Sequence, residues 1–292
     1  MMGAEQRSAD DERLHRSVKP LGSHMSVKYD MRFLAPTVCG ILGVRPPSAA
    51  ETGPLEEVVG EMGPQERLAV VVIDAFGSST WAANMRETPT FNALANRRLL
   101  HLRSVMPSIT PVNFATMLTG AGPEAHNIRD RTERLALETV FDGLRERGKT
   151  SATAARALSS LGILISPHAD RPGIAASNLD EEVKAIALDH MRKGVDLLWV
   201  QLLDVDDAGH AHGPLSPQSV EACRRDDGHL REIAEAAYEE GYGLIVLADH
   251  GQHTVEDDDG VRHGTHGTEM PEDIYVPLVW SRGDELKGIL GL

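Results

Sequence analysis

Six side chains that can bind a metal ion recur in short segments of this 292-residue chain: Asp74, Asp206, His210, Asp249, His250 and His266. Asp206 and His210 are four residues apart, so on a helical turn both would face the same side and could reach one cation. The adjacent Asp249 and His250 would diverge at a strand end and could bridge, or reach two different ions. A mixture of carboxylate and imidazole suits Zn²⁺ or Mn²⁺ better than Mg²⁺. The pattern therefore predicts a divalent metal centre.

Thr110 is a candidate nucleophile. Pro111 follows it and suits the first position of a predicted helix, so Thr110 also fits a plain helix cap. The two roles are compatible, because a hydroxyl at a helix N-terminus lies among free N–H groups that attract a phosphoryl group. A coordinated ion would lower the pKa of the hydroxyl, and the amide of Asn113 could donate to a phosphoryl oxygen. The residues alone leave cap and nucleophile both open.

The elements that must position these residues are three apolar runs, each of which leads into acidic residues. The runs are LAVVVID over 68–74, DLLWVQLL over 196–203 and LIVLA over 244–248. Continuous apolar runs of this length predict buried parallel strands. Ligands of such sheets bind beyond the carboxyl ends of the strands, so we expect the acidic residues to meet at one edge. This argument does not distinguish Asp206 from Asp204.

The rest of the chain alternates in the same way. We predict further strands over 99–105, 150–155, 163–165 and 275–280, and helices over 33–45, 111–118, 139–147, 181–193 and 216–240. Strands that alternate with helices predict an α/β fold, a mainly parallel central sheet with helices on both faces. We expect one catalytic domain over residues 26–292. The polar segment 1–25 contains GSHM, which resembles a cloning scar, and is expected to be a tail, either native or a tag or linker.

The composition of the chain limits the classes of partner that it is expected to bind. With 29 basic and 44 acidic residues the formal charge is −15, which disfavours a nucleic-acid surface or an anionic membrane. No apolar run is long enough for a transmembrane helix, and the first 25 residues lack a secretory apolar region. The two cysteines, Cys39 and Cys223, are far apart and outside any CxxC motif, so we expect a reducing, cytoplasmic setting. The oligomeric state is not predicted.

At this point the chain resembles the alkaline phosphatase superfamily, and within it the nucleotide pyrophosphatase/phosphodiesterase-like branch. The resemblance rests on eight segments in a matching order, at residues 72–77, 107–113, 117–128, 206–214, 248–251, 266–268, 271–273 and 276–278. The resemblance implies an alkaline-phosphatase-like α/β domain with a minimal cap, because the segment between Ile128 and Asp196 is short. An open site of this kind favours hydrolysis over intramolecular transfer.

The resemblance also implies the division of labour at the site. Two divalent metal ions are expected, zinc or alternatively manganese. One would bind Asp206, His210 and His266. The other would bind Asp74, Asp249, His250 and the Thr110 oxygen. Thr110 would form a phosphothreonine and Asn113 would bind a non-bridging oxygen. His126 is interpreted as structural, and His212 and His263 as spare histidines near the ligands.

The expected activity is a phosphodiesterase or nucleotide pyrophosphatase that acts on a small phosphorylated substrate, a nucleotide being one candidate. A phosphomonoesterase or a phosphonate (C–P) hydrolase remains the alternative, because leaving-group choice depends on loops. The phosphonate alternative needs a basic group for a carboxylate, and Arg129, Arg131 and Lys149 are available. A non-catalytic metal-binding relative is less favoured, because no ligand or nucleophile is lost. Mutase and sulfatase activities are disfavoured by length and by the absence of a sulfatase nucleophile motif.

Overall fold

The structure is a computed structural model that describes residues 27–291. The predicted tail over 1–25 lies outside the described residues. Eight strands form the main sheet: β1 (Tyr29–Asp30), β2 (Leu68–Ile73), β3 (Leu99–Arg103), β4 (Ser151–Arg156), β5 (Arg171–Ala175), β6 (Leu197–Leu202), β7 (Gly243–Leu247) and β10 (Tyr275–Ser281). Their spatial order is β1-β3-β10-β7-β2-β6-β4-β5. All pairs are parallel except the two made by β10, so the sheet is mixed and mainly parallel.

Strand direction decides where the site forms. β2 pairs in parallel with both β6 and β7, and β3 runs the same way because both β3 and β7 are antiparallel to β10. The carboxyl ends of these four strands therefore lie at one edge of the sheet. Each of β2, β6 and β7 is buried along its whole length, as expected for central strands covered on both faces.

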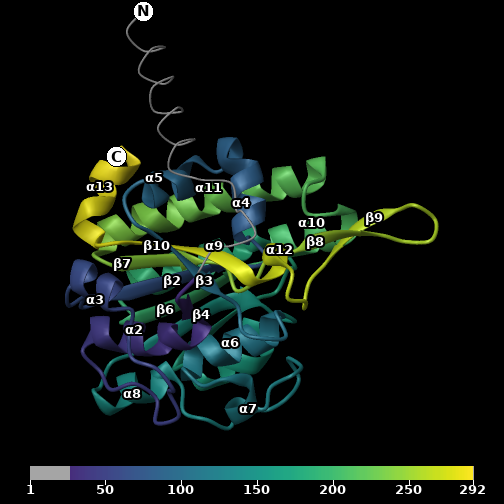
Figure 1. The fold of residues 1–292 in the computed structure, drawn as a ribbon. Helices are drawn as coiled ribbons and strands as arrows, with labels where there is room; N and C mark the ends of the chain where they lie inside the picture. The colour runs from purple at the N-terminus through teal and green to yellow at the C-terminus, as the bar shows by residue number, and fades with distance from the viewer. Residues whose placement is uncertain (1–26, 292) are drawn as a thin grey trace, which may run out of the picture.

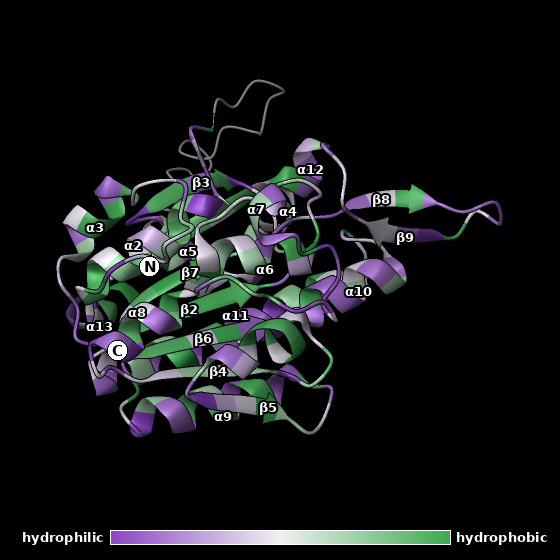
Figure 2. Cartoon of the chain, turned by 90° about the horizontal axis from the view of Figure 1, so that it is seen from below, coloured by the Kyte–Doolittle hydropathy of each residue, from purple (hydrophilic) through white to green (hydrophobic). Residues whose placement is uncertain are grey.

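Helices cover both faces of the sheet (Figure 1). One face carries α4 (Ser78–Asn84), α5 (Pro89–Ala95), α9 (Asp180–Arg192), α11 (Pro217–Glu240) and the C-terminal α13 (Leu286–Leu290). The other carries α2 (Leu34–Leu42), α3 (Glu56–Met62), α6 (Thr110–Thr119), α7 (Pro123–His126) and α8 (Val140–Glu146). The central strands β2, β6 and β7 are hydrophobic, whereas the helices carry many hydrophilic residues (Figure 2). The predicted α/β architecture is confirmed, with β10 as its antiparallel strand.

A hairpin of β8 (His253–Glu256) and β9 (Arg262–Thr265) extends from the body of the molecule beside α10 (Asp204–His212) (Figure 1). It was not predicted, and the acidic residues 257–259 form its exposed turn. The short α12 (Pro271–Ile274) connects this region to β10. No helix among the described residues is long and apolar enough to cross a membrane.

The prediction of a strand at Ile163–Ile165 is wrong. Those residues belong to a π-helix over Leu161–Ile165, and the edge of the sheet is formed by β5 instead. A short apolar run does not distinguish a strand from a buried helical turn. The true strand was obscured by Pro172 and Gly173, which an edge strand tolerates. The helices α4 and α5 were also missed.

Candidate active site

The carboxyl edge of the sheet gathers all six predicted ligands and Thr110. Asp74 directly follows β2, and Asp249 and His250 follow β7 after one residue. Asp206 and His210 lie on α10, which begins just after β6. His266 follows β9 and Thr110 is the first residue of α6, which the loop after β3 leads into. Four strands and one hairpin thus converge on one place.

The three histidines are oriented by the backbone. Nδ1 of His210 lies 3.0 Å from the carbonyl oxygen of Gly264, that of His266 lies 3.0 Å from Ser108 O, and that of His250 lies 3.1 Å from Gly251 O. A carbonyl only accepts, so each Nδ1 carries the proton. Each Nε2 therefore presents a lone pair to the site, which is the arrangement that prepares a histidine for a metal ion.

Two of these lone pairs face each other. Nε2 of His210 and Nε2 of His266 are 3.1 Å apart, and neither has a hydrogen to donate to the other. This close approach is repulsive unless a cation lies between them. Two nitrogens bound to one tetrahedral Zn²⁺ would be about 3.3 Å apart, given a Zn–N distance near 2.05 Å. The observed spacing fits that expectation.

The carboxylates are each anchored through a hydrogen bond from a buried donor. Oδ2 of Asp74 accepts from Nε2 of Gln201 at 2.6 Å, and Oδ1 of Asp206 accepts from Nε2 of Gln252 at 2.6 Å. Oδ1 of Asp249 accepts from the backbone N–H of Ala75 at 3.3 Å. Asp74 and Asp249 each keep one buried oxygen without a partner among the described residues. Orphaned carboxylate oxygens beside imidazole lone pairs match the donor set of a divalent cation.

The six candidate ligands lie in two groups of three. Asp74, Asp249 and His250 are buried, and Nε2 of His250 lies 3.4 Å from the free oxygen of Asp74 and 3.5 Å from that of Asp249. Asp206, His210 and His266 lie nearer the surface, with the side chain of His210 43% exposed. The rings of His250 and His266 stack with centroids 3.9 Å apart, so the two groups are adjacent. The donor sets fit two neighbouring ions, one buried and one reached from solvent.

Burial makes the ionised carboxylates of this site unfavourable when no cation is bound. Desolvation raises the pKa of Asp206 and of Asp249 to about 7, and together with the charge of Asp249 it raises that of Asp74 well above the usual range. Desolvation also lowers the pKa of His250 to about 3 and that of His266 to about 2. The imidazoles of His250 and His266 are therefore neutral at neutral pH, so their Nε2 lone pairs can bind a cation.

Thr110 lies at the buried group. Its Oγ1 is 3.0 Å from Nε2 of His250, and because that nitrogen carries no hydrogen, the hydroxyl donates to it. The side chain caps nothing: the N-cap position of α6 is Ile109, and Thr110 is already helical. The hydroxyl therefore sits at the positive end of α6 and points into the ligand cluster. The cap interpretation of Thr110 finds no support in this geometry.

Asn113 is placed differently from its predicted role. It is fully buried, its Oδ1 accepts from the N–H of Val105 at 2.9 Å, and its Nδ2 donates to the carbonyl oxygens of Ile109 and Val105. Both amide hydrogens are thus engaged in bracing the loop that leads to Thr110. The structure supports a positioning role for this side chain.

The sequence analysis missed the two glutamines. Gln201 is the only polar residue in the buried strand β6, and that isolated amide was an available signal. Gln252 had no comparable signal, because its importance depends on a close approach. It packs against Gly209, where an added Cβ would lie 1.8 Å from its Oε1. Gly209 thus leaves room for Gln252 to reach Asp206.

Several other candidates lie outside the ligand cluster. His126 is buried, its Nδ1 accepts from the N–H of Ile128 and its Nε2 contacts Thr116, which agrees with the structural interpretation. Lys149 pairs with Asp196 at the amino edge of the sheet, away from the site. Arg129 donates to the backbone carbonyls of Pro123, in α7, and of Ile128. His212 lines a surface groove at the end of α10.

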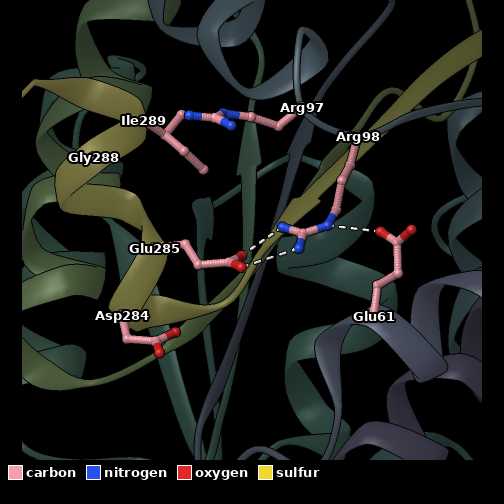
Figure 3. A pocket seen from close by; sticks show the side chains of 7 residues that line it. All are labelled: Glu61, Arg97, Arg98, Asp284, Glu285, Gly288 and Ile289. Atoms are coloured by element: carbon pink, nitrogen blue, oxygen red, sulfur yellow. Dashed lines mark hydrogen bonds and ion pairs between the residues drawn. The ribbon is translucent and has the colours of Figure 1, made fainter.

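A surface cavity of 640 Å³ lies at the opposite edge of the sheet, between the start of β3 and α13 (Figure 3). Its Arg98 is paired with Glu61 and Glu285 across the cavity, so its charge is already neutralised. None of the predicted ligands lines this cavity. Its size does not make it a second active site.

Comparison with known proteins shows the family and the fold of this chain. The model of the type I phosphodiesterase / nucleotide pyrophosphatase family matches residues 68–134 and 132–277. Murine ectonucleotide pyrophosphatase/phosphodiesterase 5 superimposes with a TM-score of 0.58 at 14% identity, over 77% of this chain and 94% of that one. Phosphonoacetate hydrolase from Sinorhizobium meliloti 1021, solved with phosphonoformate, gives a TM-score of 0.54 at 20% identity, over 68% of this chain and 60% of that one.

A 2,3-bisphosphoglycerate-independent phosphoglycerate mutase from Paracoccus denitrificans is 31% identical over 122 residues, which are 41% of this chain and 23% of the mutase. The chain therefore matches less than a quarter of that relative's length. Fold and site together define a member of the alkaline phosphatase superfamily. Within it, the chain belongs to the type I phosphodiesterase / nucleotide pyrophosphatase family.

Proposed function

We propose that this protein is a two-metal-dependent hydrolase of phosphate esters, a phosphodiesterase or nucleotide pyrophosphatase that works through a phosphothreonine at Thr110. The observation that carries the proposal is the convergence of three Nε2 lone pairs and three carboxylates beside one helix-terminal hydroxyl. The metals would be two zinc ions, with manganese as the alternative, because the donors are imidazole and carboxylate.

In the proposed reaction the Thr110 oxygen attacks phosphorus as its proton is lost, and the leaving alcohol takes up a proton. Water then hydrolyses the phosphothreonine, which releases the phosphate or phosphomonoester and restores the hydroxyl. The two cations, when bound, lower the pKa of the attacking group and neutralise charge on the phosphoryl oxygens. The N-terminus of α6 presents free N–H groups to the same oxygens.

The remaining residues of the chain hold this arrangement in place. Gln201 and Gln252 fix the orientation of one carboxylate in each group. Asn113 braces the loop before Thr110, and Ser104 donates to the carbonyl oxygen of Asp249 at 2.6 Å. These contacts keep the nucleophile in position, which accounts for much of the rate enhancement in enzymes of this kind.

Exposure of His210 supports the hydrolytic proposal, because a substrate and water can approach from that side. A nucleotide substrate is supported by the murine relative, of which an inactive threonine-to-alanine variant was solved in complex with AMP. The phosphonate alternative would have to rely on Arg131 for the substrate carboxylate, because Lys149 is remote and Arg129 donates to backbone carbonyls.

The proposal is tested by parallel initial rates on bis-p-nitrophenyl phosphate, p-nitrophenyl phosphate, a dinucleotide and phosphonoacetate, each with added Zn²⁺ or Mn²⁺. We expect hydrolysis of the diester and dinucleotide to dominate. Dominant release of phosphate from phosphonoacetate or from the monoester would replace the proposed activity. An inactive protein that retains both ions would refute catalysis altogether.

A further inference from the structure

We propose a third cation site, separate from the active site, formed by Asp180, Asp204 and Asp226 and suited to a hard divalent cation such as Ca²⁺ or Mg²⁺. These residues come from three elements: Asp180 begins α9, Asp204 begins α10 and Asp226 lies in the middle of α11. Each offers a carboxylate oxygen, and the three oxygens lie within 4.8 Å of one another. Separations below this limit are compatible with Ca²⁺, since oxygens on opposite sides of the ion would be about 4.8 Å apart.

Asp226 is the residue that points to a ligand. It is 1% exposed, and both of its carboxylate oxygens are buried without a hydrogen-bond partner among the described residues. Such an unpartnered buried carboxyl group is costly, whether it is charged or neutral. Protonation would engage at most one of the two oxygens with a neighbouring carboxylate and would leave the other without a partner. A bound cation satisfies both oxygens.

The neighbouring carboxylates differ from Asp226 in this respect. Oδ1 of Asp180 accepts from the buried guanidinium of Arg156 at 2.8 Å, and its Oδ2 accepts from the N–H groups of Leu203 and Asp204. Asp204 is paired with Arg156 and with Arg225. These contacts hold two carboxylates in place and leave each with spare lone pairs. Asp226, which lies close to both, receives no such contact.

Charge counting supports a divalent ion. When all three are ionised, as ligands of a cation would be, Asp180, Asp204 and Asp226 carry three negative charges, and Arg156 is the one cation buried with them in the part of the chain that the structure describes. Arg225 and Asp207 are about half exposed and face solvent. The buried group is therefore left with a net charge of −2, which one divalent cation neutralises. Oxygen-only ligands favour Ca²⁺ or Mg²⁺ over zinc.

The site would link three helices next to the active site. Asp204 precedes the ligand Asp206 by two residues on α10, so their side chains leave the helix on different sides. A cation bound to Asp204 would hold the start of α10 against α9 and α11 and would stabilise the fold around the outer metal group.

The test uses full-length protein loaded with Zn²⁺, then equilibrated with Ca²⁺ or with Mg²⁺, and measures bound Ca²⁺ or Mg²⁺ per chain and the melting temperature. For the wild type we expect one additional ion and a melting temperature that rises with the concentration of that ion. Asp226→Asn should lower the affinity for this ion at least about tenfold, because loss of an outer contact alone costs that much. Asp207→Asn is the matched control and should keep it, because Asp207 also contacts Arg156 but lies outside the triad.

Two results would overturn the proposal. One is a wild-type protein that takes up neither Ca²⁺ nor Mg²⁺ beyond the zinc centre, which needs no variant to establish. The other is undiminished uptake by folded Asp226→Asn. If the ion binds but Mg²⁺ and Ca²⁺ differ in affinity, the tighter one identifies the cation of the site.

Discussion

Substitution of Gln252 should lower the affinity for one of the two metal ions and leave the affinity for the other unchanged. Gln252 is 2% exposed and its Nε2 donates to Oδ1 of Asp206 at 2.6 Å. Gln252→Met keeps the volume and removes the donor. A hydrogen bond to a charged group contributes about 1.5–3 kcal/mol. Its loss corresponds to a roughly 10–150-fold lower affinity for the ion held by the group of Asp206.

Gln201→Met is the matched control, because Gln201 makes the same contact with Asp74 in the other group. The assay is a zinc titration of metal-free protein against a competing chelator, which resolves two dissociation constants. We expect Gln252→Met to raise one dissociation constant and Gln201→Met to raise the other. Unchanged constants in both variants, or the same constant affected by both, would refute the assignment of one glutamine to each ion.

Three further predictions concern the same site. Thr110→Ala should lower kcat on an aryl phosphodiester by at least about 10³-fold while zinc content stays the same, and activity near that of the wild type would remove Thr110 as nucleophile. Zinc affinity should fall as pH drops through about 7, because zinc must displace protons from Asp206 and Asp249, and burial raises the pKa of both to about 7 in the metal-free protein. Calorimetry in buffers of different ionisation enthalpy measures this proton release. A zinc affinity that stays constant from about pH 6 to 8 would contradict the prediction. Gly209→Ala should lower zinc affinity about as much as loss of the Gln252 hydrogen bond, since the added Cβ would lie 1.8 Å from Oε1 of Gln252. A zinc affinity equal to that of the wild type would show that Gln252 can move aside and still hold Asp206.

Much of the site was predictable because strand direction does the positioning. An apolar run that ends in an acid, such as 68–74, places its carboxylate at the edge of a parallel sheet, and three such runs must share that edge. The spacing of Asp206 and His210 required only one helical turn, and α10 supplies it. Those inferences depend on local pattern and on a general rule of sheet topology.

What was not predictable depends on tertiary packing. The hydrogen bond from Gln252 to Asp206 joins residues 46 apart and exists because Gly209 allows a close approach. The buried amide of Asn113 turned inward to its own loop, which the sequence T-P-V-N does not reveal. The sequence of the edge strand β5 contains proline and glycine and therefore predicts a loop, and only its pairing with β4 shows that it is a strand.

The central claim is that two metal ions bind side by side at the carboxyl edge of this sheet. Anomalous diffraction at the zinc edge, from crystals of zinc-loaded protein, measures this directly. We predict two peaks about 3.5–4 Å apart, one contacting Asp74, Asp249 and His250, the other contacting Asp206, His210 and His266. A single peak, or peaks away from these six side chains, would contradict the two-metal site.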